Sequence, residues 1–165
     1  MIKIENTAEG GEQAVIKDSG DRREYATGAV RDMADGKGRC DLLPLDVAAS
    51  FIDPCSVLYH MNCFMESRKL AHLKQAVSAF CSERKWDAPT MLLEVAKHME
   101  EGAKKYGERN WEKGLPPDCY VDSAVRHYLK WKRGDNDEPH DRAFCWNVMC
   151  CIWTIMHKSE KGCEQ

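Results

Sequence analysis

The spacing of apolar residues is the strongest constraint on the fold, because they recur every three or four positions through most of the chain beyond residue 55. This is the period of an α-helix that buries one face. The pattern predicts helices over residues 55–83, 91–106, 121–133 and 138–155, preceded by a short helix that ends near residue 51. No segment alternates apolar and polar residues as a half-buried strand does. The sequence therefore predicts an all-α fold.

These helices fit one domain over residues 25–160, since a chain of 165 residues is long enough to bury a single core. Residues 1–24 are polar and show no sustained period, which predicts a flexible tail. The last predicted helix is apolar on more than one side, because Trp146 and Trp153 lie off the stripe that contains Val148. Such a helix belongs at the centre of a bundle or at a contact between subunits.

The charge and hydropathy of the chain exclude two classes of partner. The net charge of −3 offers no electrostatic argument for nucleic acid, which favours a basic face. No apolar run approaches the roughly 20 residues that a membrane-spanning helix needs, and the N-terminus lacks the apolar stretch of a secretory signal. We therefore expect a cytoplasmic protein that has neither nucleic acid nor a membrane as its partner.

Nine cysteines are many for this length, but their arrangement is unlike that of a disulfide scaffold. The number is odd, no C-x-x-C pair occurs, and most of the cysteines lie in apolar helical stretches. Free cysteine packs as a small hydrophobe and stays reduced in the cytosol. Structural thiols are therefore favoured, and a zinc site made of scattered cysteines and histidines is the weakest functional hypothesis.

Two pairs of potential metal ligands are separated by three residues, the spacing that places both members on one face of a helix. They are His98 with Glu101 and Glu138 with Asp141. Carboxylates from two helices suit Mg²⁺ or Mn²⁺, so Glu101, Glu138 and Asp141 are the first candidates, with His98 as a fourth ligand. Two simpler interpretations stay open. Acids are common in the first turn of any helix, and a histidine beside a core is often only a packed polar residue.

A metal ion held by these carboxylates would bind a triphosphate and activate a water molecule. Nearby cations, with Lys105 in a catalytic role, would neutralise charge that develops on the phosphates. The candidates for contact with such a substrate are Lys37, Arg39, Lys104, Arg109, Asn110, Trp111, Arg126 and Asn147. Some of these also have ordinary structural interpretations. The glycines around Lys37 also suit a solvated turn, Trp111 suits core packing, and Arg126 lies one helical turn from Asp122 and can pair with it.

Five strings of residues together resemble one known family. They are Gly28-Ala-Val-Arg-Asp32, Gly36-Lys-Gly-Arg-Cys-Asp-Leu-Leu-Pro44, Glu101-Gly-Ala-Lys-Lys-Tyr-Gly-Glu-Arg-Asn-Trp-Glu-Lys-Gly114, Asp122-Ser-Ala-Val-Arg-His127 and Asp137-Glu-Pro-His-Asp-Arg-Ala-Phe-Cys-Trp-Asn147. The family is the phage and bacterial domain named dATP/dGTP diphosphohydrolase. The resemblance spans about residues 27–155 and is interrupted by a helical insert at about residues 50–88.

That family is similar to the all-α nucleoside triphosphate pyrophosphohydrolases related to MazG, so the resemblance implies a MazG-like helical bundle. Those enzymes bind Mg²⁺ through a Glu-x-x-Glu pair and a later Glu-x-x-Asp pair. Here His98-x-x-Glu101 and Glu138-x-x-Asp141 stand in those places, and the histidine is the departure.

The function implied by the resemblance is Mg²⁺-dependent hydrolysis of dATP or dGTP to the monophosphate and pyrophosphate. It also implies a homo-oligomer, commonly a dimer or tetramer, acting in the host cytoplasm if the protein is phage-encoded. The alternative is a nucleotide-binding or interaction module that uses the same pocket without catalysis. The residues themselves do not determine which base or sugar is preferred.

Overall fold

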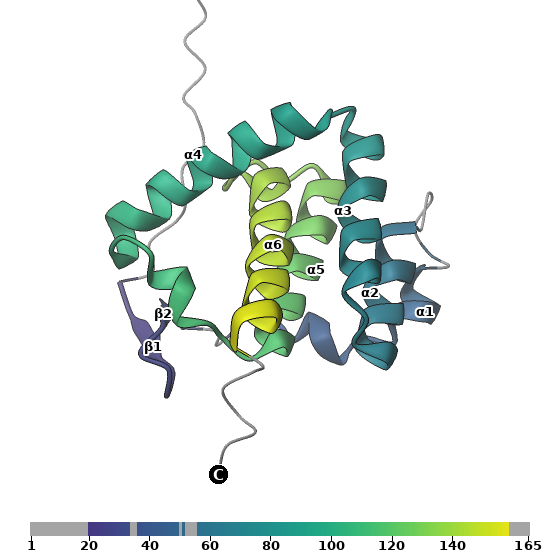
Figure 1. Cartoon of the computed structure of the whole chain (residues 1–165). Coiled ribbons are helices and arrows are strands. Elements are labelled where there is room, and N and C mark those ends of the chain that lie inside the picture. The colour runs from purple at the N-terminus through teal and green to yellow at the C-terminus, as the bar shows by residue number, and fades with distance from the viewer. Residues whose placement is uncertain (1–19, 34–35, 50, 52–55, 159–165) are drawn as a thin grey trace, which may run out of the picture.

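The computed structural model describes residues 20–33, 36–49, 51 and 56–158, and Figure 1 shows a bundle of helices with one small β-ribbon. The helices are α1 (Leu45–Ala49), α2 (Ser56–Ser67), α3 (Leu70–Arg84), α4 (Ala88–Tyr106), α5 (Pro117–Arg133) and α6 (His140–Lys158). Strands β1 (Arg22–Glu24) and β2 (Val30–Asp32) pair antiparallel, and the short 3₁₀ turns are η1 (Cys40–Leu42) and η2 (Asn110–Lys113). The all-α prediction is confirmed.

Helices α5 and α6 pack side by side at the centre of the bundle. Helices α2 and α3 pack against each other on one flank, where α1 contacts α2 and α3 contacts α6. Helix α4 crosses α6 on the other side and extends beyond the bundle toward the β-ribbon (Figure 1). Over the residues that the structure describes, none of these helices is long and apolar enough to cross a membrane.

A cluster of aromatic rings joins α3 to the two central helices. The ring centroid of Phe80 on α3 lies 4.6 Å from that of Phe144 on α6 and 6.3 Å from that of Tyr128 on α5. All three side chains are fully buried. The predicted insert over residues 50–88 contains two helices, α2 and α3, and the second of them supplies part of the main core.

The β-ribbon is not predicted by the sequence, because strands of three residues are too short to show an alternating pattern. A tight turn closes it, in which the amide of Gly28 donates to the carbonyl of Tyr25 at 2.7 Å. Gly28 has a φ of 77°, which a residue with a side chain rarely adopts. Strand β1 lies within the segment predicted to be a flexible tail, so regular structure begins earlier than that prediction places it. Residues 1–19 lie outside the described residues.

Two helix boundaries differ from the sequence pattern for local reasons. The helix predicted over residues 55–83 is divided into α2 and α3, because Arg68 adopts a left-handed conformation with a φ of 55° and ends α2. The helix predicted from residue 91 begins earlier, at Ala88, and its N-cap is Asp87. The Asp87 side chain accepts a hydrogen bond from the Thr90 amide at 2.8 Å, which is the usual N-cap geometry.

The start of α6 also differs, and this difference changes the candidate site. The sequence pattern starts the last helix at Glu138, whereas α6 begins at His140. The amide of Ala143 donates to the carbonyl of Pro139 at 3.1 Å, so Pro139 supplies the first helical acceptor. Glu138 therefore precedes the helix, and the Glu138–Asp141 pair is not held on one helix face.

Replacing Phe80 by alanine should lower the free energy of unfolding by about 3–5 kcal/mol, because it empties a fully buried position between α3, α5 and α6. The matched control is Phe51→Ala, since Phe51 is 82% exposed and its truncation should change the stability by less than about 0.5 kcal/mol. Equilibrium urea denaturation measures both. Equal effects of the two changes would show that α3 is not part of the main core.

Candidate functional site

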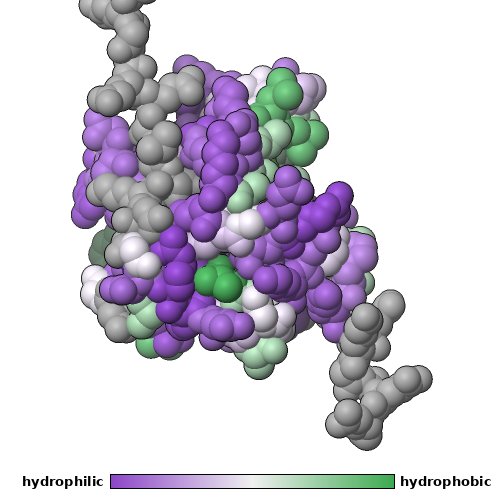
Figure 2. Space-filling view, turned by 90° about the vertical axis from the view of Figure 1, so that its left-hand side faces the viewer, coloured by the Kyte–Doolittle hydropathy of each residue, from purple (hydrophilic) through white to green (hydrophobic). Residues whose placement is uncertain are grey.

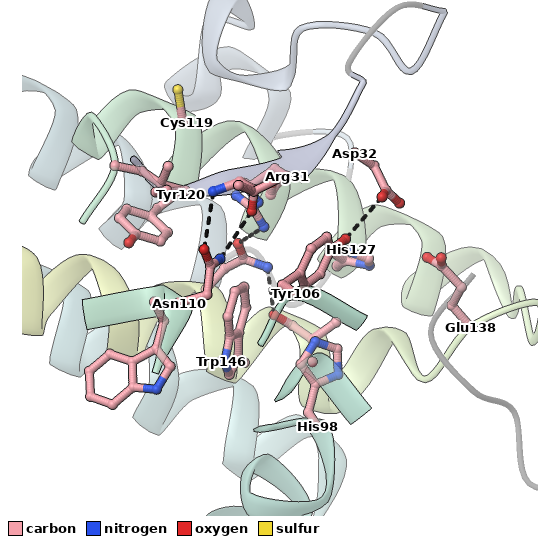
Figure 3. A pocket seen from close by; sticks show the side chains of 18 of the residues that line it. Arg31, Asp32, His98, Tyr106, Asn110, Cys119, Tyr120, His127, Glu138 and Trp146 are labelled. Atoms are coloured by element: carbon pink, nitrogen blue, oxygen red, sulfur yellow. Dashed lines mark hydrogen bonds between the residues drawn. The ribbon is translucent and has the colours of Figure 1, made fainter. Parts of the chain in front are cut away.

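A cavity of about 540 Å³ lies between β2, α4, η2, α5 and the chain that leads into α6 (Figure 3). This volume suits a small organic ligand such as a nucleotide. Among the charged residues that line it, six are cationic (Arg23, Arg31, Lys37, Arg109, Arg126, Lys130) and four are acidic (Asp32, Asp122, Asp137, Glu138). The lining is thus more cationic than the chain as a whole, whose net charge is −3. The outer face beside the ribbon is mostly hydrophilic (Figure 2).

The carboxylate of Asp32 attaches the ribbon to the C-terminal end of α4. It accepts hydrogen bonds from Arg22 at 3.1 Å, from the Tyr106 hydroxyl at 3.0 Å and from Lys105 at 2.8 Å. Burial and then the charge of Asp32 raise the pKa of Tyr106, which keeps its phenol protonated as a donor. Lys105, predicted to be catalytic, has a side chain that is only 7% exposed and belongs to this clamp instead of lining the cavity.

The Asn110 side chain is engaged by the backbone of the ribbon. Its Oδ1 accepts from the Val30 amide at 3.2 Å, and its Nδ2 donates to the Val30 carbonyl at 3.1 Å. The neighbouring Trp111 packs edge-on against Trp153 of α6, with ring centroids 4.9 Å apart. Both residues line the cavity, as their predicted contact with a nucleoside requires. The amide of Asn110, however, serves to build the wall, and Trp111 also has the packing role that its alternative interpretation describes.

One end of the cavity is aromatic (Figure 3). The guanidinium of Arg31 lies 5.9 Å from the ring centroid of Tyr120 and 5.5 Å from that of Trp146. It also donates to Oδ1 of Asn147 at 2.8 Å. Asn147, one of the predicted substrate contacts, is buried and lines the cavity, and its Nδ2 donates to the Ala143 carbonyl.

His98 lies beside this aromatic end and is nearly buried, with 7% of its surface exposed. Its ring centroid is 5.3 Å from that of Trp146, and its Nδ1 has no hydrogen-bond partner. Burial, followed by the positive charges of Arg142 and Arg31, lowers the pKa of His98 to about 3. The imidazole is therefore neutral, with an unsatisfied nitrogen at the cavity wall.

The three carboxylates predicted to bind a metal do not converge. Oε1 of Glu101 lies 2.6 Å from a guanidinium nitrogen of Arg142, and Oδ2 of Asp141 lies 3.0 Å from Nε of Arg84. Neither acid lines the cavity, whereas Glu138 does. The described residues therefore do not fit an ion held jointly by Glu101, Glu138 and Asp141, and the main reason is that two arginines engage two of the acids.

The predicted phosphate contacts divide into two groups. Lys37, Arg109 and Arg126 line the cavity, and Arg126 is oriented by Asp122, whose Oδ2 lies 2.8 Å from the guanidinium. Burial lowers the pKa of Lys37, with nearby charges contributing less. The other two lie outside the lining: Lys104 pairs with Glu100 at 2.6 Å on the exposed face of α4, and Arg39 pairs with Asp41.

Potential metal ligands gather around His140 and include Glu138, but neither Glu101 nor Asp141. Among the described residues, ligand atoms lie within 4.8 Å of one another in the groups His127, Glu138, His140 and Asp135, Asp137, His140. Neither group contains a cysteine, so the described residues give no support to a cysteine-based zinc site. Burial, and then His140, lowers the pKa of His127 well below its usual value.

Sequence reasoning did not assign a role to several residues of the cavity, namely Arg31, Asp32, Tyr120, His127 and Trp146. A signal for most of them was present, since all except Tyr120 lie inside the strings that carry the family resemblance. What the strings do not indicate is which of their side chains face the cavity, because that depends on the packing of α4, α5 and α6.

Residues 68–163, more than half of the chain, match the family described as dATP/dGTP diphosphohydrolase, N-terminal. The chain belongs to this family. The match covers α3 to α6 and therefore every helical wall of the cavity, while the ribbon and Lys37 lie before it. The family's description names a diphosphohydrolase, which is a hydrolase. No curated protein and no solved structure matches the chain significantly.

Replacing Glu101 by glutamine should destabilise the protein by about 3 kcal/mol, because it removes the negative charge beside a guanidinium whose side chain is 6% exposed. The control is Glu100→Gln, since Glu100 forms the same kind of pair with Lys104 on an exposed face and should matter little. Urea denaturation in the presence of a chelator measures both. A different result would show that Glu101 is a metal ligand. In that case the variant and the unsubstituted protein would be equally stable without metal, and the variant would be the less stable of the two once Mg²⁺ is added to both.

Stability should fall in acid because of His98. Its pKa is 6.5 in an unfolded chain and about 3 here, so between these values the unfolded state binds a proton that the folded state does not. The neutral His98 imidazole therefore makes its full contribution to the free energy of unfolding above pH 6.5. As the pH falls below that value, the contribution decreases by up to about 1.4 kcal/mol for each pH unit. His98→Phe keeps a ring beside Trp146 and should weaken the pH dependence of stability. Part of that dependence should remain, because His127 also contributes to it. Urea denaturation from about pH 7 to about pH 4 tests it, and parallel losses in both proteins would refute it.

Proposed function

We propose that this protein hydrolyses dATP or dGTP to the nucleoside monophosphate and pyrophosphate, with Mg²⁺ or Mn²⁺ as the divalent cation. The observation that carries the proposal is a nucleotide-sized cavity, with an aromatic end and an excess of cations, in a chain of the dATP/dGTP diphosphohydrolase family. An excess of positive charge in a recess concentrates anions such as a triphosphate.

The phosphates are assigned to the end of the cavity formed by Lys37, Arg126 and Lys130. Arg126 and Lys130 are four residues apart on α5 and so share one face of that helix. Lys37 is close enough to Arg126 and Glu138 for their charges to act on its pKa. Fixed cations at this end stabilise the negative charge that develops as the bond to the α-phosphorus breaks.

The nucleoside is assigned to the aromatic end, where Tyr120 and Trp146 provide rings for stacking. Arg31 and Asn147 hydrogen-bond to each other beside these rings and offer both donors and acceptors to a base edge. His98, neutral and with an unsatisfied Nδ1, offers a further polar contact at the same end.

The divalent cation enters the proposal with the substrate. Mg²⁺ is usually bound by one or two carboxylates together with the phosphates of a nucleotide. Glu138 lines the cavity and is the one member of the predicted carboxylate set that does so. No catalytic step is assigned to an ion held by Glu101 and Asp141, because those acids face arginines.

A homo-oligomer is part of the proposal. Large apolar side chains remain exposed along α4, with Leu92 50% and Leu93 67% exposed. Met156 near the end of α6 is 53% exposed as well. Such surfaces are typical of contacts between subunits, and sedimentation velocity measures the number of chains directly.

A second candidate function is nucleotide binding without hydrolysis. It is favoured by one observation, namely that Arg142 and Arg84 engage Glu101 and Asp141, two of the three acids predicted to bind metal. The two functions share the cavity and differ only in turnover.

A panel of deoxy- and ribonucleoside triphosphates with Mg²⁺ or Mn²⁺, read by pyrophosphate release, tests the proposal. We expect release from dATP and dGTP and a loss of about 100-fold or more in rate when Glu138 is replaced by glutamine. Lys37→Gln should weaken substrate binding, whereas Lys104→Gln is the matched control because Lys104 lies outside the lining. Binding of dATP or dGTP with no pyrophosphate release would favour the binding module, and neither binding nor release would overturn both.

A further inference from the structure

Two histidine rings face each other where α5 meets the chain leading into α6. Nδ1 of His127 lies 2.9 Å from Nδ1 of His140, and the ring planes are inclined by 40°. His140 is almost completely buried, and His127 lines the cavity. Two imidazole nitrogens at this separation share either one proton or one metal ion, because two lone pairs alone would repel each other.

The orientation of His140 is set by the acid three residues before it. Nε2 of His140 lies 2.8 Å from Oδ1 of Asp137. An ionised carboxylate only accepts hydrogen bonds, so Nε2 carries the ring proton and Nδ1 presents a lone pair toward His127. A carboxylate behind an imidazole in this way is the arrangement that orients most metal-binding histidines and makes them stronger ligands.

Glu138 completes a set of three ligand atoms. Its Oε2 lies 3.9 Å from Nδ1 of His140, and ligand atoms of His127, Glu138 and His140 all lie within 4.8 Å of one another. Two nitrogens bound at about 2.0–2.1 Å to one ion stand roughly 2.9–3.4 Å apart. The observed separation of 2.9 Å lies at the short end of this range.

We propose that His127, His140 and Glu138 form a binding site for a divalent transition-metal ion such as Zn²⁺. Two imidazoles and one carboxylate suit Zn²⁺ and its neighbours in the first transition row, whereas Mg²⁺ prefers oxygen ligands throughout. Three protein ligands leave a fourth position open, as in catalytic zinc sites. Since His127 and Glu138 both line the cavity, that position faces the space where a ligand would bind.

The ion would take the place of the proton now shared by the two rings. Without metal, Nδ1 of His127 donates to the lone pair of His140. Binding requires His127 to carry its proton on Nε2 instead, which is a change of tautomer and leaves its charge unchanged. The site uses neither Glu101 nor Asp141, and it does not depend on nucleotide hydrolysis.

The test uses the full chain without an affinity tag, stripped of metal by a chelator and assayed with no nucleotide present. Isothermal titration with Zn²⁺, together with elemental analysis, should find one ion per chain. His127→Gln and Glu138→Gln each remove a ligand and should weaken binding by at least tenfold. Asp137→Ala removes the support of His140 and should weaken it by about 10–100-fold. His157→Gln is the matched control, since His157 is exposed near the end of α6 and should leave binding unchanged.

Co²⁺ separates this site from the cysteines, because thiolate ligands give near-ultraviolet charge-transfer bands that nitrogen and oxygen ligands lack. We expect visible bands without a thiolate band, and their loss in His127→Gln. A thiolate band that persists in His127→Gln, or Zn²⁺ affinity that is unchanged in both ligand variants, would overturn the proposal. Failure of pyrophosphate release leaves these metal measurements intact, so the two proposals fail separately.

Discussion

The contacts of the Asp32 carboxylate hold one wall of the cavity in place. Asp32 binds Lys105 and Tyr106 at the end of α4 and Arg22 on β1. With the Lys105 side chain 7% exposed and that of Asp32 15% exposed, solvent screens their attraction only weakly. A ribbon of two three-residue strands is too small to be stable by itself. It closes the cavity because Asp32, together with the two hydrogen bonds of Asn110, attaches it to α4 and η2.

Arginines determine which acids face the cavity. Arg142 engages Glu101 and Arg84 engages Asp141, and both carboxylates lie outside the lining. Glu138 remains at the wall because α6 begins two residues after it. The result is a cavity whose charged lining is mainly cationic, and this is the electrostatic basis for a phosphate-bearing substrate.

The proposed nucleotide chemistry and the proposed transition-metal site meet at Glu138. The family match and the cationic lining support a nucleotide in the cavity. The paired histidines and Asp137 support an ion at its edge. An ion with an open position at this place would face the phosphate end, where Lys37 and Arg126 lie. The two proposals share Glu138 and otherwise rest on different contacts, and together they describe one continuous site.

The sequence by itself determined the helical class and most of the helices, because the 3.6-residue period is a local property that packing preserves. The three-residue spacing also predicted that His98 and Glu101 share a helix, and both lie on α4, where His98 is buried and Glu101 is half-buried. The family strings pointed to the right region of the chain, since all five contribute residues to the cavity lining, among them Arg31, His127 and Trp146.

Only the tertiary structure decided which side chains meet. The pairs Glu101–Arg142 and Arg84–Asp141 join residues 41 and 57 positions apart, and no local pattern encodes such a choice. The start of α6 at His140, after Pro139, separated Glu138 from the helix face that spacing alone assigns to it. His140, the first residue of α6, also lies against His127 of α5. A charged or metal-binding group takes the partner that packing places within reach, and sequence spacing predicts that partner only when both residues lie in one helix.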